Sequence, residues 1–415
     1  MWIVGGAIRD YFLKKEIKDI DFAINIDINV FIKSINKTQI KVITRNIDYG
    51  IVSLILNNKE YQITSLRNDL ASYGRQASVE QTDKIELDAS RRDFTVNAIY
   101  LDSLGNLFDP FNGIDDIKNR KLRFIGDPIK RCEEDYLRVI RFCRFYSLFP
   151  NKKISNIFIK NILVKLDNIN LLSNKRMKDE LTKILNNKSF ELSLSMIQKL
   201  SLDKYILYSK NIQKNERENK GFKIKNFKIL KYLKFFGSDV IDDSKLDLLS
   251  IFIPHLYDFN QLQAAYLRLE FSKKTMKYYN FLKQIKPIYS PIDVKNFKDI
   301  TNQSKKIEII KTLWKMKNRI FFLNKSIYRN ERIPISWCKL GLFHILPYED
   351  LKKINVLDIH LPKCPFNRNH ILQLSKVSDY NEIKLLLFKA EQYWVNNNFS
   401  SSLYEIQNFF KINFK

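Results

Sequence analysis

The chain lacks the features that mark membrane-spanning and secreted proteins. Its 415 residues contain no run of 18 apolar residues, and the N-terminus enters a strand-like segment at once. We therefore expect neither a membrane-spanning helix nor a secretory signal. Cysteine is also rare, and the four thiols have no paired spacing, which is typical of reduced cysteines in a cytoplasmic protein. They are Cys132, Cys143, Cys338 and Cys364. With 45% hydrophobic residues the chain can bury a large core, so we expect a soluble globular protein.

Glycine is scarce, and its distribution divides the chain. Seven of the ten glycines precede residue 127, and so does almost every apolar segment of period two. From Cys132 onward the pattern becomes helical, with long amphipathic segments and few helix breakers. This predicts an α+β fold, in which an N-terminal head with a mixed sheet and helices precedes an all-helical neck, body and tail. The expected domains are residues 1–127, 128–190, 191–290 and 291–415.

The periodicity also predicts individual elements. The strands are expected at Trp2 to Val4, Ile20 to Ile24, Lys41 to Ile43, Ile51 to Leu56 and Tyr61 to Ser65, with a helix near Asn29 to Ile35. The later helices are expected at Glu133 to Leu148, Lys153 to Leu166, Asn174 to Asn186, Phe190 to Gln198, Leu262 to Leu269, Lys306 to Ile320, Tyr348 to Ile354, Ile383 to Trp394 and Ser401 to Ile412. Residues 211–221 are charged and poor in apolar side chains, which indicates a surface linker.

Acidic residues are few relative to basic ones, and the formal net charge is +26. Such an excess is more than solubility needs, and it indicates a polyanionic partner, most simply a nucleic acid held through its phosphates. The alternative is a compositional bias of the genome, because an AT-rich coding sequence raises the lysine content without any ligand. The charge by itself favours nucleic-acid binding only slightly.

The segment at residues 3–24 brings together groups suited to nucleotidyl transfer. Gly5 and Gly6 interrupt a short strand and supply a turn that a triphosphate can approach closely, and Arg9 follows as a charged donor. Asp19 and Asp21 alternate with an apolar residue, so on a strand both carboxylates lie on one face. Two such carboxylates beside a phosphate-binding turn are suited to Mg²⁺. A Gly-Gly or an Asp-x-Asp alone is more often a surface feature; the order of the elements within 22 residues is what carries the hypothesis.

Two stretches between this segment and the helical region add to the chemistry. Residues 66–90 are too irregular for a core element and long enough for a functional loop that moves over the site. The stretch Arg91 to Ala98 offers Arg92, Asp93 and Asn97; arginines next to carboxylates can bind triphosphate or ribose, and Asn97 can fix a turn. For an isolated Arg-Arg-Asp the better interpretation is an ordinary surface salt bridge. The following GIDDIKNRKLRFIGDP predicts a turn, a short helix and a strand.

The helix expected from Glu133 carries a second pair of interest. Helical rotation places Arg138 on its polar side and Asp135, three residues earlier, at the border of that side. Such a pair is usually a solvated ion pair worth a few tenths of a kcal/mol. A carboxylate accepts hydrogen bonds and a guanidinium donates them in a flat fork, so the pair can also read the edge of a nucleotide base.

Together these stretches resemble the class II tRNA nucleotidyltransferases, which are the bacterial-type CCA-adding enzymes and their close relatives, the bacterial poly(A) polymerases. The resemblance covers roughly residues 1–186 in motif order and spacing. Its motifs are VGGAIRD with KDIDFAI, SRRDFTVNAIY, DPFNGIDDI with LRFIGDP, EEDYLRVIRFCRF and KRMKDELTKIL. The resemblance implies roles for individual residues. Asp19 and Asp21 would hold the metal ions and be catalytic. The nucleotide would be bound by Gly5, Gly6, Arg9, Arg92 and Asp93, and its base would pair with Asp135, Arg138, Arg141 and Arg144. Asp93 would contact the ribose, and Arg176 with Glu180 would brace the neck helix.

The implied function is addition of C, C and A to the tRNA 3′ end from CTP and ATP. The tRNA 3′-hydroxyl attacks the α-phosphorus, pyrophosphate leaves, and Mg²⁺ is the expected cofactor. The loop at residues 67–75 is similar to the loop with which full CCA-adding enzymes switch from CTP to ATP. Many relatives have an acidic residue where Gln62 stands, so a third metal-binding carboxylate is not expected there. We expect tRNA, ATP and CTP as partners, with no membrane and no stable protein partner.

The sequence leaves alternatives open. One is a bacterial poly(A) polymerase or a specialist that adds only A. Another is a non-catalytic RNA-binding protein of the same fold. It is disfavoured because the central residues of the site are all present, namely Asp19, Asp21, Asp135 and Arg138. No His-Asp dipeptide occurs, so the metal-dependent phosphohydrolase domain of some relatives is absent. A metal site at His360, Cys364 and His370 is less favoured than ordinary packing. A basic stretch is expected to hold the acceptor and TΨC arms of tRNA. It consists of Lys223, Lys225, Lys228, Lys231 and Lys234.

Overall fold

The chain forms two compact units. The computed structural model describes residues 1–35, 38, 40–73, 76–149, 166–203, 205, 227–244, 246–256, 265–266, 268–285, 307–314, 316, 335–343, 349, 351–352, 355, 359–374, 377 and 379–413. The first unit comprises Met1–Phe222 and Ala264–Glu270, and the second Lys223–Gln263 and Phe271–Lys415. The predicted boundaries at residues 127, 190 and 290 are not decided by this division and stay a prediction.

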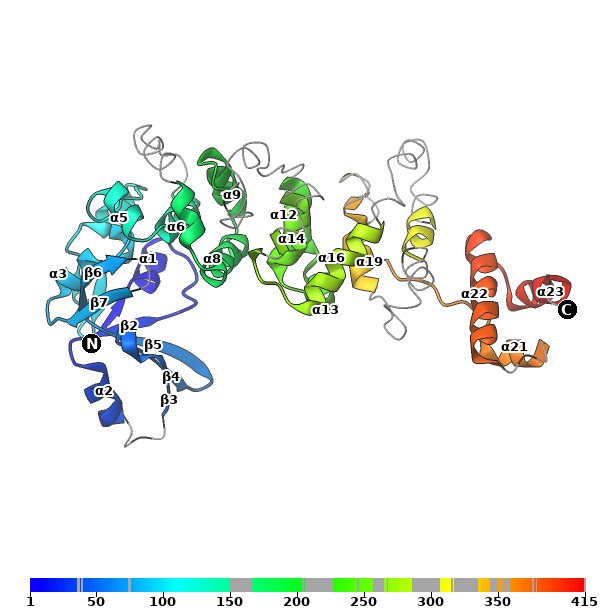
Figure 1. Cartoon of the computed structure of the whole chain (residues 1–415), viewed down its shortest axis with the longest axis horizontal. Helices are drawn as coiled ribbons and strands as arrows, with labels where there is room; N and C mark the ends of the chain where they lie inside the picture. Colours follow the sequence, from blue (N-terminus) through cyan, green and yellow to red (C-terminus); the bar gives the residue numbers. More distant parts are fainter. Residues whose placement is uncertain are drawn as a thin grey trace. The chain divides into compact units, whose positions relative to one another are not determined.

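A seven-stranded mixed sheet forms the centre of the head (Figure 1). Its order is β3-β4-β5-β2-β1-β8-β9, and β2 with β5 is the parallel pair, while the other neighbours are antiparallel. The strands are β1 (Trp2–Val4), β2 (Asp21–Ile24), β3 (Lys41–Asn46), β4 (Ile51–Leu56), β5 (Lys59–Ser65), β8 (Tyr100–Asp102) and β9 (Leu107–Phe108). All five predicted strands are present; β1 and β4 have the expected bounds, and the others differ by one to three residues.

Both faces of this sheet are covered by apolar side chains, which explains why its short strands are rich in aliphatic residues. On one face Ala23 of β2 joins a cluster with Val4 and Tyr100. On the other face Ile24 packs with Ile28 and other residues of the helix α2 (Ile28–Ile35). Alternation along β2 therefore places Asp21 on the same face as Ala23.

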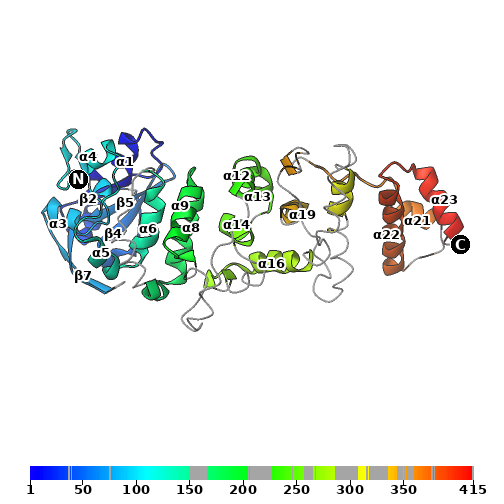
Figure 2. The same cartoon turned by 90° about the horizontal axis from the view of Figure 1, so that it is seen from above.

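Helices complete the first unit. They are α1 (Gly6–Phe12), α3 (Ile85–Ser90), α4 (Gly113–Lys118), α5 (Pro128–Glu134), α6 (Leu137–Tyr146), α8 (Asn174–Asn186) and α9 (Phe190–Lys199). Short 3-10 turns lie at Ile47–Tyr49, Thr95–Asn97 and Leu166–Leu171. Helices α6, α8 and α9 lie side by side and contact one another (Figure 2). The predictions at 174–186 and 190–198 are confirmed, and the one at 153–166 lies almost entirely outside the described residues.

The helix expected at 133–148 is broken, which corrects the prediction. Asp135 has extended backbone angles (φ −152°, ψ 105°) and separates α5 from α6. Its Oδ1 accepts a hydrogen bond from the backbone amide of Leu137 at 3.1 Å. A short acidic side chain that bonds nearby backbone amides competes with helix continuation, so the aspartate ends one helix and begins the next. The periodicity of the apolar residues carries no sign of this break.

The stretch at 66–90, expected to be an irregular loop, also differs from the prediction. It forms an antiparallel hairpin of β6 (Arg67–Tyr73) and β7 (Gln76–Gln81), followed by α3. Its few large apolar residues hide this hairpin from a search for period two, because its strands form a separate two-stranded sheet. Downstream, the strand expected within LRFIG is reduced to a single bridge between Phe94 and Phe124.

The second unit is helical in the residues that the structure describes. Its labelled helices are α12 (Phe227–Phe236), α13 (Ser238–Ser244), α14 (Leu248–Leu256), α16 (Lys273–Ile285), α19 (Ile335–Leu342), α21 (Arg368–Leu374), α22 (Tyr380–Asn396) and α23 (Leu403–Asn413). The helices predicted at 383–394 and 401–412 correspond to α22 and α23. The helices expected at 262–269, 306–320 and 348–354 are described only in part. Their described residues are helical, apart from a turn at residue 269. The linker expected at 211–221 lies outside the described residues. The mixed-sheet head and the helical remainder confirm the predicted α+β class.

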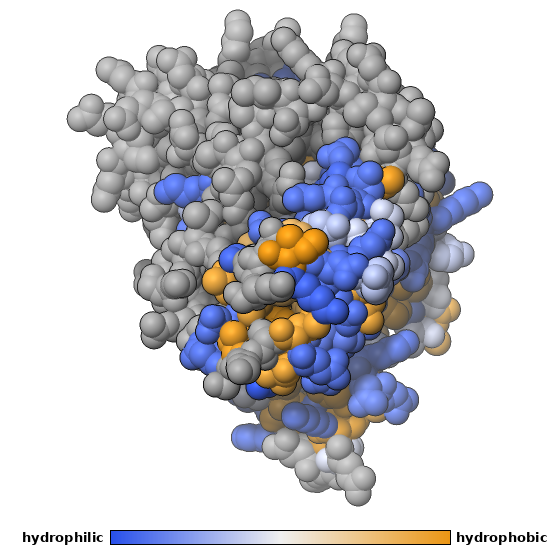
Figure 3. All heavy atoms as spheres, turned by 90° about the vertical axis from the view of Figure 1, so that its right-hand side faces the viewer, coloured by the Kyte–Doolittle hydropathy of each residue, from blue (hydrophilic) through white to orange (hydrophobic). Residues whose placement is uncertain are grey.

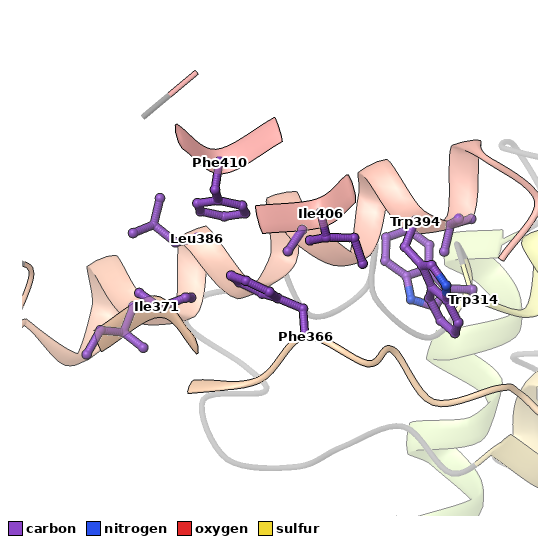
Figure 4. Packing of buried hydrophobic residues seen from close by; sticks show 10 residues of the cluster. Trp314, Phe366, Ile371, Leu386, Trp394, Ile406 and Phe410 are labelled. Carbon is purple, nitrogen blue, oxygen red and sulfur yellow. The ribbon is translucent and has the colours of Figure 1, made fainter. Parts of the chain in front are cut away.

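Helices α21, α22 and α23 share a small aromatic core (Figure 4). Phe366 and Phe410 stack with ring centroids 4.9 Å apart, and Ile406 and Trp394 are buried beside them. On the face drawn in the space-filling view, hydrophobic residues lie among hydrophilic ones (Figure 3). The core explains how the last helices are held together, since such short helices need a buried face.

In the described part of the chain no helix is both long and apolar enough to cross a membrane.

Gly113 is required by close packing, which generates a first prediction. A Cβ built on this residue would lie 2.2 Å from the backbone oxygen of Thr95. Gly113→Ala should therefore destabilise the head by about 1–3 kcal/mol through overpacking. Hydrogen-exchange mass spectrometry of head peptides across a urea series measures this. Gly6→Ala is the matched control, because its Cβ would meet only the tip of Arg9 at 3.7 Å; equal stability of the two variants would contradict the packing argument.

Candidate active site

Four neighbouring strands, β8, β1, β2 and β5, meet at the end of the sheet where the predicted site residues lie. In the register of the sheet Val4 pairs with Asp21 on one side and with Tyr100 on the other. Asp21 in turn pairs with Gln62 of the parallel neighbour β5. The glycine turn that follows Val4 therefore begins beside the carboxylate of Asp21, as the motif order predicts.

The turn itself needs glycine. Gly5 has φ +75°, a left-handed conformation that glycine adopts without strain. Its amide donates to the carbonyl of Ile99 at 3.1 Å, which ties the turn to the strand end of β8. A Cβ on Gly5 would come within 3.5 Å of Nη1 of Arg92. The glycine turn and Arg92, distant in the sequence, are thus in contact range.

Asp19 and Asp21 lie where a cation would be expected. Strand β2 begins at Asp21, so Asp19 precedes the strand rather than lying within it, contrary to the prediction. The pKa of Asp21 is raised, first because the surrounding protein removes part of its hydration and then because Asp19 lies nearby; Arg92 opposes the shift. Within the described residues neither carboxylate takes part in a hydrogen bond or ion pair. Both residues are exposed to solvent, and two unpaired carboxylates so placed fit a divalent cation that completes its coordination with water and phosphate.

Asp88 forms the most heavily bonded carboxylate of the site. It is 1% exposed, and its Oδ2 accepts hydrogen bonds from Arg92 (3.0 and 3.2 Å) and from the hydroxyl of Tyr100 (2.6 Å). Its Oδ1 accepts from Arg91 at 2.6 and 2.9 Å and from the backbone amide of Arg67 at 3.3 Å. Although burial alone would raise the pKa of Asp88, the two arginines and the tyrosine hold it at about 2. The carboxylate fixes Nε and Nη2 of Arg92, so that Nη1 faces the glycine turn.

A second buried carboxylate, that of Asp93, connects the RRDFTVN stretch to helix α6. Asp93 is 7% exposed; its Oδ2 pairs with Arg141 at 2.6 Å, and its Oδ1 accepts from the amide of Phe94 (2.9 Å) and from Nδ2 of Asn97 (3.0 Å). Arg141 and these hydrogen bonds outweigh burial and lower the pKa of Asp93. Oδ1 of Asn97 accepts from Nη1 of Arg9 at 2.7 Å. Arg9 and Arg141 are thus linked through two side chains of the RRDFTVN stretch.

Three guanidinium groups surround one phenyl ring. The Cζ atoms of Arg9, Arg141 and Arg144 lie 4.9, 5.4 and 4.3 Å from the ring centroid of Phe145. The ring offers a negative face to these cations, which would otherwise repel one another. Arg144 also forms an ion pair with the buried carboxylate of Glu180 at 2.5 Å. Burial lowers the pKa of Arg144 to about 10, so it stays charged at neutral pH. This concentration of positive charge suits a polyphosphate.

The two residues expected to read a base are not paired with each other. Asp135 pairs through Oδ2 with Arg176 of α8 at 2.6 Å. Arg138 donates from Nη1 to Glu134 at 2.6 Å and to the carbonyl of Arg131 at 2.8 Å. Both side chains lie at the junction of α5 and α6, close in sequence and held by separate partners. The expected bracing by Arg176 is present, although its partner is Asp135, and Glu180 contacts Arg144.

Sequence reasoning missed Asp88, Tyr100 and Glu134. A signal for Asp88 exists, since it precedes Arg91 and Arg92 by three and four residues, the spacing of ion pairs on a helix. Glu134 stands four residues before Arg138 and offers the same signal. Tyr100 has none, because its contact with Asp88 depends on strand pairing. Elsewhere, the described residues contain no group of three potential metal ligands from His, Cys, Asp and Glu, and His370 instead stacks on Phe366.

The depressed pKa of Asp88 generates a prediction on stability. Its folded-state pKa of about 2 lies below the unfolded value of about 3.9, so the ionised carboxylate stabilises the head above about pH 4. That stabilisation, about 2 kcal/mol, should disappear as the pH falls from 4 toward 2. Asp88→Asn should lower the free energy of unfolding by at least this much at pH 7. The stability of the variant should also fall less steeply as the pH is lowered, which gives a flatter acid limb of the stability curve.

Hydrogen exchange of head peptides in urea at several pH values measures this difference. Asp115→Asn is the control, because the Asp115 carboxylate is exposed on α4 and is screened by water. A variant at position 88 with the stability and the acid limb of the unsubstituted protein would refute the role of Asp88.

Comparison with known proteins was made for the sequence and for the fold. Residues 1–123 match the family described as the poly A polymerase head domain. The human protein named CCA tRNA nucleotidyltransferase 1, mitochondrial, is 34% identical over 254 residues, which cover 59% of this chain and 58% of the relative. A CCA-adding enzyme of Staphylococcus aureus is 32% identical over 217 residues, with 52% and 53% covered. The chain thus spans little more than half the length of these curated relatives.

Solved structures extend the likeness to nearly the whole chain, for the fold alone. The CCA-adding enzyme of Bacillus stearothermophilus in complex with CTP has a TM-score of 0.62 at 20% identity, covering 98% of this chain and 91% of the other. The Thermotoga maritima CCA-adding enzyme complexed with tRNA-CCA has a TM-score of 0.64 at 15% identity, covering 100% and 91%. The matched head domain, these relatives and the shared fold agree with the motifs at residues 1–186: the first part of the chain is similar to poly A polymerase head domains and to CCA-adding enzymes, and the chain has the fold of the latter.

Proposed function

We propose that the chain is a CCA tRNA nucleotidyltransferase that adds C, C and A to the 3′ end of tRNA from CTP and ATP without a nucleic-acid template. The observation that carries the proposal is the arrangement at one end of the sheet. Unpaired Asp19 and Asp21 lie beside the glycine turn, and Arg141 of α6 is linked through Asp93 and Asn97 to Arg9 of α1, the helix that follows this turn. The names of the sequence relatives support the same activity.

Asp19 and Asp21 would hold the metal, which we propose to be Mg²⁺. When bound, the ion would lower the pKa of the attacking hydroxyl and offset charge on the phosphates. The raised pKa of Asp21 agrees with this role, since a carboxylate in a partly desolvated place next to a second carboxylate is relieved by a cation. Gln62 beside Asp21 brings an amide oxygen and no charge, which leaves the pair as the acidic ligands.

The arginines would bind the triphosphate. Nη1 of Arg92 faces the turn of Gly5, and Gly6 leaves the same turn open except for Arg9 at 3.7 Å. The guanidinium group of Arg9 lies close to the ring of Phe145, together with those of the arginines of α6. Their charge would offset that of the phosphates and of the leaving pyrophosphate, without any covalent enzyme intermediate.

Selection of CTP and ATP would come from the junction of α5 and α6. Asp135 keeps acceptor capacity beyond its bonds to Leu137 and Arg176, and Arg138 presents a guanidinium oriented by Glu134. A carboxylate and a guanidinium held in place can pair with a base edge and reject one with the wrong pattern, because its polar groups stay unpaired. Arg141 and Arg144 would extend this arginine row toward the phosphates.

The proposed macromolecular partner is tRNA. The net charge of +26 suits a polyanion, and Lys228 and Lys231 are exposed on α12. Lys223 and Lys225 lie outside the described residues. The proposed location is the cytoplasm, in keeping with four described cysteines that form no disulfide.

Incorporation of labelled nucleotides tests the function. Purified protein is given CTP and ATP, separately and together, with tRNA transcripts that end before CCA, after C and after CC. Ordered addition of two cytidines and one adenosine, followed by a stop, is expected. Adenosine added only to the CC-ended transcript would indicate an A-adding specialist, and a long adenosine tail a poly(A) polymerase. Absence of incorporation with intact tRNA binding would indicate a non-catalytic RNA-binding protein.

Removal of either metal-binding carboxylate should abolish catalysis. Asp19→Ala and Asp21→Ala are expected to lower incorporation by at least a thousandfold, since the metal contributes several kcal/mol of charge stabilisation. Binding of tRNA, measured by filter retention, should stay within about twofold. Asp115→Ala, at an exposed carboxylate of α4, is the control and should keep full activity. Activity retained without either aspartate would remove the metal assignment.

Removal of the base-reading groups should change nucleotide choice. Asp135→Ala and Arg138→Ala are expected to relax the preference for CTP and ATP over UTP and GTP by about ten- to a hundredfold, the value of a good bidentate contact to a base. Competition assays with pairs of labelled nucleotides measure the preference. Asp127→Ala, which removes the cap of α5, is the control for general disturbance of the same region. Unchanged fidelity in both variants would contradict the template role.

A further inference from the structure

Four exposed cations of the first unit form what we call the basic surface. They are Lys15, Arg120, Lys183 and Lys188. Lys15 follows α1, Arg120 follows α4, Lys183 lies in α8, and Lys188 follows α8. In the described part of the chain none of the four takes part in an ion pair, whereas the arginines of the candidate active site are held by carboxylates. Among the described residues, the charge of the basic surface is therefore not neutralised by a partner.

The surroundings of Lys15 show that positive charge is in excess there. The pKa of Lys15 is lowered, first because the surrounding protein removes part of its hydration, and further because Arg9, Arg120 and Lys188 lie nearby. Asp10 opposes this shift, but its carboxylate is already paired with Arg9 at 2.8 Å. Cations that act on one another in this way are stabilised by an added anion. The ends of α1, α4 and α8 thus offer a common place for negative charge.

Helix α8 extends the basic surface to the candidate metal site. Glu180 of this helix pairs with Arg144 at 2.5 Å, and Lys183 follows three residues later on the same side of the helix. Lys183 is close enough to Asp21 to act against the raised pKa of its carboxyl group. The basic surface therefore begins within electrostatic reach of the carboxylate pair and continues past the end of α8.

The nature of these cations favours an RNA backbone over a free nucleotide as their ligand. The arginines of the candidate active site are largely buried and held in one orientation, which suits a single small ligand. The cations of the basic surface are exposed and come from three separate helix ends. Three of them are lysines, which act as mobile point charges. Such groups neutralise the phosphates of a strand without reading its sequence.

We propose that the basic surface binds the phosphates of the RNA strand whose 3′ end enters the candidate active site, with Lys183 nearest to the terminal nucleotides. The inference rests on the proposed function, which takes tRNA as the substrate. The phosphates of an RNA end brought to Asp19 and Asp21 are repelled by these carboxylates. Cations next to the carboxylates offset this repulsion and guide the strand toward them.

A variant that loses charge and keeps the aliphatic stems tests the proposal. The surface variant carries Lys15→Gln, Arg120→Gln and Lys188→Gln. It retains Lys183, which lies next to the proposed catalytic carboxylates. The substitutions remove cations that repel one another, so the variant is expected to fold, and hydrogen exchange of head peptides verifies this.

The matched control loses the same two lysines and one arginine in number, at other exposed positions. It carries Lys33→Gln in α2, Arg45→Gln in β3 and Lys84→Gln at the N-cap of α3. Both variants lower the net charge equally, so they differ only in the place where the charge is lost.

Binding of a tRNA transcript that ends before CCA is measured by filter retention over a salt series. The surface variant should bind about ten- to a hundredfold more weakly at about 0.1 M salt, and the control variant should stay within about threefold of the unsubstituted protein. The slope of log K against log salt should be flatter by about two in the surface variant, because each lost contact to a single strand removes about 0.7. Equal losses in the two variants would overturn the proposal.

The KM for CTP separates RNA binding from nucleotide binding. In the surface variant it should stay within about twofold at saturating tRNA, because these cations do not touch the nucleotide. A raised KM for CTP with unchanged tRNA binding would assign the cations to the nucleotide and overturn the proposal.

Neutral linkages locate the contact on the RNA. Methylphosphonates are placed one at a time at the phosphates that precede the terminal nucleotide. Each should weaken binding to the unsubstituted protein, and most of this effect should be absent in the surface variant, as in a double-mutant cycle. Equal effects in both proteins would contradict a contact between these phosphates and the basic surface.

The single variant Lys188→Gln guards against a folding defect of the triple variant. Its salt slope should be flatter by about 0.7, and an unchanged slope would overturn the proposal. Should the unsubstituted protein bind no tRNA, the proposed function fails first and this proposal with it. Normal tRNA binding with a surface variant that binds like the unsubstituted protein would refute the basic surface alone.

Discussion

The site depends on buried carboxylates that hold arginines in place before any nucleotide arrives. An arginine side chain has many conformations, and fixing one at the moment of binding costs free energy. In this head Asp88 holds Arg92, Asp93 holds Arg141 and Glu180 holds Arg144. The cost of ordering these side chains is therefore met in folding, and the proposed site would offer fixed donors to a triphosphate.

The same carboxylates solve a problem of charge. Guanidinium groups gathered around Phe145 would repel one another strongly in a poorly hydrated place. Each anion reduces that repulsion, and the phenyl ring adds a neutral surface with a negative face. Arg9, Arg141 and Arg144 each pair with a carboxylate, that of Asp10, Asp93 and Glu180 in turn. The arginines of the proposed site can thus stay together in the absence of a ligand.

Much of the head follows from the sequence, and the exceptions have physical causes. Alternating apolar residues predict the strands, and the spacing of Asp19, Asp21 and the glycine turn predicts which strand end carries the site. The break at Asp135 was missed because a side chain that bonds its own neighbours leaves the apolar periodicity intact. Tyr100 and Asn97 gain their site contacts only through strand pairing and the fold of the turn, which no local pattern encodes.

The base of the hairpin β6–β7 has a consequence of a mechanical kind. Leu66 is fully buried and donates to Ile24, Thr82 donates to Leu66, and the amide of Arg67 donates to Asp88. The hairpin is thus held at its root by hydrogen bonds, one of them to the carboxylate that orients Arg92. When a hairpin held in this way bends, its far end moves most and its root moves least. A movement of the outer part of the hairpin therefore need not disturb the arginines, whereas a shift of the root would reach them at once.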